Sequence, residues 1–162
     1  MNKLKTVFVD RDGVINQERS DYVKSISELE IYPNVAKNIK LLKDAGFLVV
    51  VITNQSAVNR GIITHEMINQ IHNSIQDHLK KYGTFLDGFY YCPHTPNENC
   101  NCRKPKPGLL QQAILELNID LNSSWMIGDR DTDIEAADSI GCKAIKINDN
   151  FSLDNAVEKI LN

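Results

Sequence analysis

Short apolar runs alternate with amphipathic helical patterns along this chain, and this alternation constrains the fold more than any other feature. Residues 47–52 form a continuous apolar run, which is typical of a strand buried on both faces of a sheet. Strands that alternate with helices imply a parallel sheet that is covered on both sides. The sequence therefore predicts an α/β fold, a three-layer sandwich with a central parallel sheet and helices on both faces.

The expected elements follow from apolar spacing and from residues that suit helix ends. Pro33 suits a first helical turn, Gly46 the position after a helix, and Ser152 a helix N-cap. We expect strands at residues 5–10, 47–52, 85–91, 124–128 and 143–147, and helices at residues 33–45, 64–82, 107–117, 131–140 and 152–161. The segment 93–106 is expected to be irregular. The whole, residues 1–162, is expected to be one Rossmann-like domain, because 162 residues with 42% apolar side chains suffice for one core.

Composition narrows the class of protein and of partner. No apolar run approaches the roughly 18–20 residues that a membrane helix needs, and no signal-peptide pattern opens the chain. We therefore expect a cytoplasmic protein without a membrane partner. We expect a monomer, because the motifs lie in loops and no helix has an obvious exposed apolar face. The net charge of −3 argues against a nucleic-acid partner, which usually requires a basic face. A small phosphorylated metabolite needs only a few local cations and stays compatible with this balance.

Polar residues follow the predicted strands, at the edge of the sheet where α/β proteins bind ligands. Asp10 and Asp12 follow the first strand, and if its geometry persists their side chains point the same way. Two close carboxylates repel each other unless a cation or a proton intervenes, and Mg²⁺ prefers oxygen ligands. The alternative is a solvated turn closed by Gly13.

Three further polar segments follow later strand positions. Residues 53–56 supply hydroxyls and amides that suit phosphate oxygens, although an ordinary polar turn has the same composition. Arg103, Lys104 and Lys106 precede a helix start, where anions are favoured, although a solvated basic turn is the alternative. The segment 129–133 carries three aspartates. Asp129 is placed for a metal, Asp131 is expected to cap the next helix, and Asp133 is expected to support the site.

A cluster of sulfur and imidazole ligands occupies the expected irregular segment. Cys92, His94, Cys100 and Cys102 have the spacing Cys-x-His-x₅-Cys-x-Cys, and three thiolates with one imidazole suit tetrahedral Zn²⁺. All four positions are filled by protein, so the zinc in this loop, residues 92–102, is expected to be structural. The alternative is three free thiols beside an unrelated histidine. Cys142 is expected to be a small buried residue.

The order of these motifs resembles that of the haloacid dehalogenase-like superfamily of phosphohydrolases. With the zinc loop, the chain looks like the D-glycero-D-manno-heptose 1,7-bisphosphate phosphatases and the related histidinol phosphatases. Both types carry an Asp-Arg-Asp-Gly start, a Thr-Asn-Gln turn, a Cys-Pro-His…Cys-x-Cys-Arg-Lys-Pro loop and Gly-Asp after the fourth strand. The segment 59–64 and the Pro107-Gly108 pair resemble the heptose type. The short span between His94 and Cys100, with Arg130 and Asp133, keeps the histidinol type open.

The resemblance implies roles for the strand-end residues. Asp10 is the nucleophile, Asp12 the general acid and base, and Mg²⁺ is held by Asp10, the backbone carbonyl of Asp12, and Asp129. Thr53 and Lys104 stabilise the transferring phosphoryl group. The remaining substrate contacts are expected from Asn54, Gln55, Ser56, Arg103 and Arg130. A second phosphate of the substrate is expected to meet Arg103 or Arg60.

The gaps between motifs leave no room for a large cap domain. Residues 16–32 are too few for one, so the loops 16–22 and 93–103 are expected to wall the site instead. Two other classes stay open at this point. A phospho-accepting receiver domain would hold phosphate on an aspartate, but an acid-base group such as Asp12 promotes turnover. A zinc-knuckle nucleic-acid binder is disfavoured by the acidic balance.

Overall fold

A single five-stranded sheet forms the centre of the protein, which a computed structural model describes over residues 2–162. Every strand pair is parallel, and the spatial order is β3-β2-β1-β4-β5. The strands are β1 (Thr6–Val9), β2 (Leu48–Asn54), β3 (Gly88–Cys92), β4 (Trp125–Gly128) and β5 (Lys143–Lys146). This arrangement confirms the predicted parallel α/β sheet.

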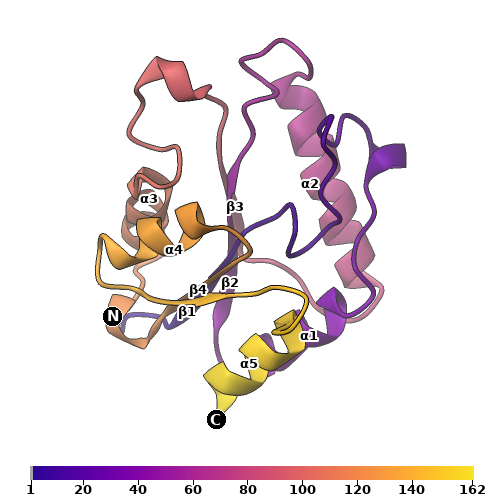
Figure 1. Ribbon diagram of the computed structural model, residues 1–162. Coiled ribbons are helices and arrows are strands. Elements are labelled where there is room, and N and C mark those ends of the chain that lie inside the picture. Colours follow the sequence, from indigo (N-terminus) through magenta and orange to yellow (C-terminus); the bar gives the residue numbers. More distant parts are fainter. Residues whose placement is uncertain (1) are drawn as a thin grey trace.

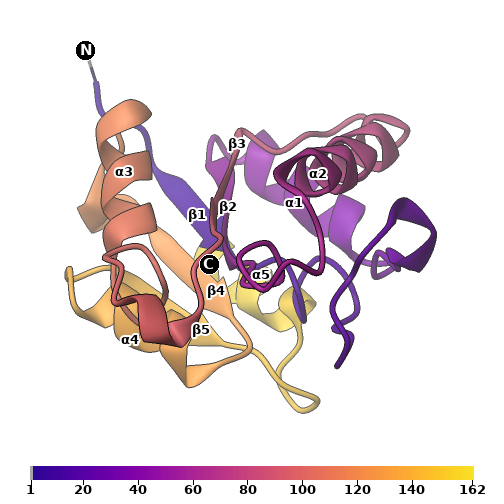
Figure 2. The ribbon, with the colours of Figure 1, turned by 90° about the horizontal axis from the view of Figure 1, so that it is seen from above.

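Helices cover both faces of the sheet, as Figures 1 and 2 show. Helices α1, α2 and α5 pack on one face, and α3 and α4 on the other. Their bounds are α1 (Val35–Asp44), α2 (His65–Lys80), α3 (Gly108–Glu116), α4 (Asp131–Asp138) and α5 (Leu153–Leu161). Within the described residues, no helix combines the length and apolar character that crossing a membrane requires.

The alternation of side chains along the strands divides the core into two layers. In β1, Val7 and Val9 join the cluster beneath α1 and α5, whereas Phe8 joins the cluster beneath α3 and α4. All three side chains are buried, so this strand is apolar on both faces, as expected for the centre of a parallel sheet. The polar residue that ends this run, Asp10, is therefore anchored on a rigid strand.

The helix ends agree with the sequence signals to within a few residues. Thr64 caps α2 by accepting a hydrogen bond from Met67 N at 3.1 Å, and Ser152 caps α5. Gly46 follows α1 with a φ of +85°, the left-handed conformation that glycine adopts without strain. The helix predicted from residue 33 begins at Val35.

Two local expectations were wrong. The strand predicted from residue 85 begins at Gly88, because the side-chain amide of Gln76 hydrogen-bonds both backbone groups of Leu86 in place of a neighbouring strand. Asp131 is not the N-cap of α4 but its first residue, and its carboxylate accepts a hydrogen bond from Lys146 at 2.7 Å. The capping position belongs to Arg130, whose N–H donates to Asp133.

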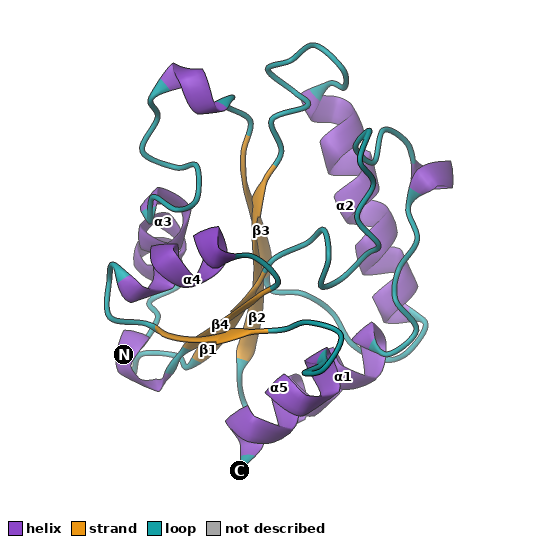
Figure 3. Cartoon of the chain, in the orientation of Figure 1, coloured by secondary structure: helices purple, strands orange, loops and turns teal. Residues whose placement is uncertain are grey.

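The connections around the carboxyl edge of the sheet are loops rather than an additional domain (Figure 3). Between β1 and α1, the described chain holds one 3₁₀ turn, Ile26–Glu28, and isolated β-bridges, so no large cap is inserted there, as expected. The segment 93–106 holds a short 3₁₀ turn, Pro96–Glu98, within otherwise irregular backbone. The carboxyl ends of β1, β2 and β4 are consequently overhung by loops alone.

Candidate active site

Strand register brings the predicted site residues together. Val9 is paired with Val51 of β2 and with Ile127 of β4, so the next residues of all three strands lie side by side. Asp10 N extends the pairing by donating to the carbonyl of Ile127 at 3.1 Å. Thr53 lies near the end of β2 and Asp129 directly follows β4.

Lys104 lies at the centre of this group, and its side chain is only 3% exposed. Its ammonium donates to Asp10 at 3.0 Å, to Asp133 at 2.6 Å and to the carbonyl of Ile52 at 2.7 Å. Burial lowers the pKa of Lys104, but Asp10 and Asp133 outweigh this effect and raise it, so the side chain stays charged. Asn54 fixes the backbone of Lys104 by bonding both its N–H and its carbonyl, at 3.0 and 3.1 Å.

Three carboxylates from Asp10, Asp129 and Asp133 can place oxygens within 4.8 Å of one another. Burial raises the pKa of Asp10 to about 7, against the lowering effect of Lys104. Burial and Asp133 likewise raise the pKa of Asp129, whose Oδ1 is buried and lacks a hydrogen-bond partner within residues 2–162. A hard cation would satisfy that oxygen and offset the repulsion, so these residues fit Mg²⁺.

Gly13 makes the position of Asp129 possible. A Cβ atom at residue 13 would lie 2.1 Å from Asp129 Oδ2, and the backbone there has a φ of +90°. Only glycine tolerates both constraints. Glycine is therefore required at position 13 because the Asp129 carboxylate, at the end of the neighbouring strand, occupies the space of a side chain.

The carboxylate of Asp12 is held from two sides. Arg11 and Asn16 both donate to Oδ1 at 3.0 Å, and Gln55 donates to Oδ2 at 2.7 Å. Burial raises the pKa of Asp12, but Arg11 and the amide donors outweigh burial and lower it below its ordinary value. Gln55 also donates to Thr53 Oγ1 at 2.9 Å, which links the two motifs.

A cleft of about 660 Å³ opens above these residues. Part of its wall comes from the loop after β1, as expected for loop 16–22; these residues are Glu18, Arg19, Ser20, Tyr22 and Val23. The other expected wall, loop 93–103, contributes only Arg103. Arg60 and Arg103 border the cleft without an ion pair to any carboxylate of the described chain, whereas Arg130 pairs with Glu18. The predicted residues that line it are Asp10, Asp12, Thr53, Asn54, Gln55, Ser56, Arg103, Lys104 and Arg130.

Several residues of the site carried no predicted role. Arg11 belongs to the Asp-Arg-Asp-Gly motif, and its charge next to two carboxylates in the sequence is a signal for its contact with Asp12. Asn16, Arg19 and Tyr22 belong to the loop expected to wall the site, but the bond from Asn16 to Asp12 had no signal in the sequence. Asp133 was expected to support the site, and its contact with Lys104 gives that support a specific form.

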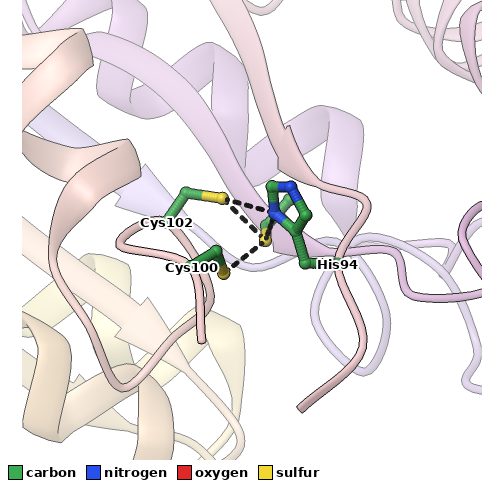
Figure 4. A group of neighbouring side chains, drawn as sticks. His94, Cys100 and Cys102 are labelled. Atoms are coloured by element: carbon green, nitrogen blue, oxygen red, sulfur yellow. Dashed lines mark hydrogen bonds between the residues drawn. The ribbon is translucent and has the colours of Figure 1, made fainter. Parts of the chain in front are cut away.

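The four predicted zinc ligands also converge, with donor atoms within 4.8 Å of one another. Figure 4 shows three of them, His94, Cys100 and Cys102, pointing toward a common centre. His94 Nδ1 lies 3.2 Å from the sulfurs of both Cys92 and Cys102, and Cys92 Sγ lies 3.6 Å from Cys100 Sγ. Burial raises the pKa of Cys92 and of Cys102, which disfavours their thiolates unless a cation binds. Three sulfurs and one nitrogen fit Zn²⁺ and leave no open ligand position. Cys142 is buried, as expected.

This cysteine cluster is tied directly to the active-site loop. Arg103 N donates to Cys100 Sγ at 3.3 Å, and Arg103 Nη1 donates to the carbonyl of His94 at 3.2 Å. Gly108 N, at the start of α3, donates to the carbonyl of Asn101 at 3.0 Å. The cluster thus fixes the backbone that delivers Arg103 and Lys104 to the cleft.

Comparison with known proteins identifies close relatives of this chain. A family model described as HAD-hyrolase-like matches residues 101–160. D-glycero-β-D-manno-heptose-1,7-bisphosphate 7-phosphatase from Neisseria meningitidis serogroup A is 38% identical over 140 residues, which cover 86% of this chain and 75% of the relative. The protein of the same name from Haemophilus ducreyi is 42% identical over 146 residues, covering 86% and 80%.

Solved structures agree with the sequence relatives. D,D-heptose 1,7-bisphosphate phosphatase from B. bronchiseptica, solved in complex with magnesium and phosphate, matches with a TM-score of 0.90 and 30% identity over 98% of both chains. A HAD-like phosphatase from Mesorhizobium loti matches with a TM-score of 0.85 and 26% identity, over 98% of this chain and 86% of the other.

Proposed function

The chain belongs to the D-glycero-D-manno-heptose-1,7-bisphosphate 7-phosphatase family of haloacid dehalogenase-like hydrolases, and we propose that it removes the C7 phosphate of that sugar bisphosphate through a phosphorylated Asp10. The observation that carries the assignment is the position of Asp10. It is buried at the end of β1, paired with Lys104, and two residues from a second carboxylate that faces the same cleft.

In the first step, an Asp10 carboxylate oxygen attacks phosphorus and the bond from phosphorus to the sugar oxygen breaks. Asp12, which Arg11 and the amide donors hold as a carboxylate in the free site, takes up a proton before this step and donates it to that oxygen, so the product leaves as an alcohol. Lys104 and Thr53 stabilise the charge of the transferring group. Asp10, Asp129 and the backbone carbonyl of Asp12 would hold Mg²⁺, which supplies positive charge against the phosphate dianion when it is bound.

In the second step, Asp12 takes a proton from water, whose oxygen forms a bond to phosphorus. The bond from phosphorus to Asp10 breaks, inorganic phosphate leaves, and both carboxyl groups return to their starting state. The amide and guanidinium donors around Asp12 suit this exchange, because they orient its carboxylate when it lacks the proton.

A bisphosphate substrate agrees with the charges of the cleft. Arg60 and Arg103 border it without a carboxylate partner among the described residues, and guanidinium groups suit bidentate contact with phosphate. Histidinol phosphate, the alternative, carries one phosphate and a cationic amine, which two unpaired arginines would repel. The volume of about 660 Å³ accommodates a phosphorylated sugar.

The zinc is proposed to be structural, with the Cys92, His94, Cys100 and Cys102 side chains as its ligands. The monomeric state, the cytoplasmic location and the extent of the single domain stay predictions. They rest on the sequence alone.

The assignment is tested by measuring phosphate release from heptose 1,7-bisphosphate and from histidinol phosphate with and without Mg²⁺. The bisphosphate should be hydrolysed far faster, and only at C7. Asp10→Asn should abolish turnover of both substrates. Retained turnover in that variant would refute the covalent route, and a preference for histidinol phosphate would reassign the substrate.

A further inference from the structure

Arg11 lies between the two catalytic aspartates in the sequence, and its buried side chain is one of those that line the cleft. Its side chain is 1% exposed, and it is one of the largest fully buried side chains of the described chain. Burying a guanidinium is costly unless it is paired and hydrogen-bonded. A side chain with this cost needs a reason beyond packing.

Contacts of the two terminal guanidinium nitrogens give that reason. Nη2 donates to Asp12 Oδ1 at 3.0 Å, and Nη1 lies 3.3 Å from Nε2 of His72 in helix α2. We infer that Arg11 and His72 are positioning residues, which hold the Asp12 carboxyl group in the orientation needed for proton transfer to the leaving sugar oxygen. This inference rests on the function proposed above.

The chemistry of the Arg11–His72 contact fixes the state of the histidine. A guanidinium has donors only, so His72 Nε2 must accept, and the ring is neutral with its proton on Nδ1. Burial and the Arg11 charge both lower the pKa of His72, to about 3, which agrees with that state. The ring is held in place by Phe89, which stacks on it with centroids 4.4 Å apart and planes 14° apart.

A neutral acceptor is better suited to this position than a carboxylate would be. A carboxylate in place of His72 would compete with Asp12 for the guanidinium charge. The neutral imidazole orients Arg11 and leaves its charge directed at Asp12. On the opposite side Gln55 holds Oδ2, so rotation of the Asp12 carboxyl group is opposed from both oxygens.

The consequence for catalysis depends on the leaving group. The value of kcat/KM covers the steps up to departure of the alcohol, so it reports proton donation by Asp12 and not the later hydrolysis of the phosphorylated enzyme. A sugar alkoxide is a poor leaving group and requires that proton. The p-nitrophenolate anion leaves without one, so p-nitrophenyl phosphate serves as the probe that does not need the positioned acid.

The experiment compares kcat/KM for heptose 1,7-bisphosphate and for p-nitrophenyl phosphate in His72→Phe, which keeps the stacked ring and removes the acceptor. The kcat/KM of His72→Phe for the sugar substrate should fall roughly 10- to 100-fold, because small misplacements of a catalytic group have effects of that order. The kcat/KM for p-nitrophenyl phosphate should change less than about threefold, because this leaving group does not need the positioned acid. His72→Gln, whose amide oxygen can accept from Arg11, should recover most of the loss.

His65→Phe is the matched control, because His65 starts the same helix and bonds Tyr91 rather than Arg11. Its two kcat/KM values should remain those of the wild type. Should His72→Phe fail to fold by circular dichroism, Arg11→Lys, which keeps the charge and loses the forked geometry, provides the same comparison.

Equal losses on both substrates, or no loss in a folded variant, would overturn the positioning role. A wild-type protein that hydrolyses neither substrate, or that forms no phosphorylated Asp10, would overturn the proposed function and this inference together. The two failures are therefore distinguished by the wild-type measurement alone.

Discussion

Replacing Lys104 by methionine tests whether the active site depends on one buried cation. The ammonium of Lys104 is almost completely removed from solvent and spends its three donors on Asp10, Asp133 and the carbonyl of Ile52. Methionine has a similar length and no charge, so the packing volume is nearly preserved. The two carboxylates lose the positive charge between them.

The expected cost follows from the burial of the partners. Removing one member of a buried ion pair costs about 3–5 kcal/mol, because the remaining charge stays desolvated. A domain of this size shifts its Tm by about 2–4 °C per kcal/mol, so Lys104→Met should melt about 6–20 °C lower near neutral pH. Activity should fall by a factor of at least about 100, since a preorganised charge at the phosphoryl group is lost.

The size of this defect should depend on pH in a defined direction. Burial already raises the pKa of Asp10 to about 7, and the loss of Lys104 raises it further. A folded-state pKa above the unfolded value gives stability at low pH that is lost as the pH rises through the folded pKa. The melting defect of Lys104→Met should therefore be smaller at about pH 5.5 than at about pH 8.

The assay is thermal unfolding followed by circular dichroism, without added Mg²⁺, at both pH values. Lys106→Met is the matched control, because its exposed ammonium donates only to the carbonyl of Cys100. That variant should lose less than about 1 kcal/mol. Equal melting temperatures for the two variants would show that the buried ion pairs of Lys104 with Asp10 and Asp133 do not stabilise the fold as described above.

Four further outcomes are expected. Cys102→Ser should lower bound zinc from close to one ion per chain, measured by atomic absorption, and reduce Tm; full zinc content would contradict the ligand set. Gly13→Ala should raise the Mg²⁺ concentration needed for half-maximal activity, because its Cβ displaces Asp129. Arg60→Ala should raise KM for the bisphosphate more than for a sugar monophosphate; equal increases would exclude it from the second phosphate. The pKa of His72 is about 3 in the folded protein and 6.5 when unfolded, so only the unfolded chain binds this proton between pH 7.5 and pH 5. Lowering the pH over that range should therefore reduce the free energy of unfolding by about 2 kcal/mol. That component should be missing from urea unfolding of His72→Phe.

The sheet and the edge that carries the candidate site were predictable because both follow from local pattern. A continuous apolar run identifies a central parallel strand, and the carboxyl ends of parallel strands must meet at one edge. Asp10, Thr53 and Asp129 were therefore predictable from their positions directly after or within such runs. The register that places Val9 beside Val51 and Ile127 depends on the strand order, which the structure shows.

The deviations arose where a side chain replaced a backbone partner. The predicted start of β3 failed because Gln76, on α2, satisfies the backbone of Leu86 across ten residues of sequence. The predicted cap at Asp131 failed because Asp133 accepts the N–H of Arg130. The first contact depends on the packing of α2 against the segment before β3, and propensity at a single position cannot contain that information. The second is a local contact at the start of α4, which only the backbone position of Arg130 decides.

The support of Asp12 is the most instructive case, since part of its signal was present in the sequence. His72 lies on α2 beside the apolar stripe of Ile68, Ile71 and Ile75, where a polar ring is costly to bury. A histidine at such a position calls for a buried partner, and Arg11 is a charged residue of the first motif that also needs one. The two residues are 61 positions apart, so only the packing of α2 against the loop after β1 joins them. Stability alone would favour apolar side chains in place of Arg11 and His72. The cost of burying these two polar groups is therefore best explained by their effect on Asp12, whose carboxylate they hold in position.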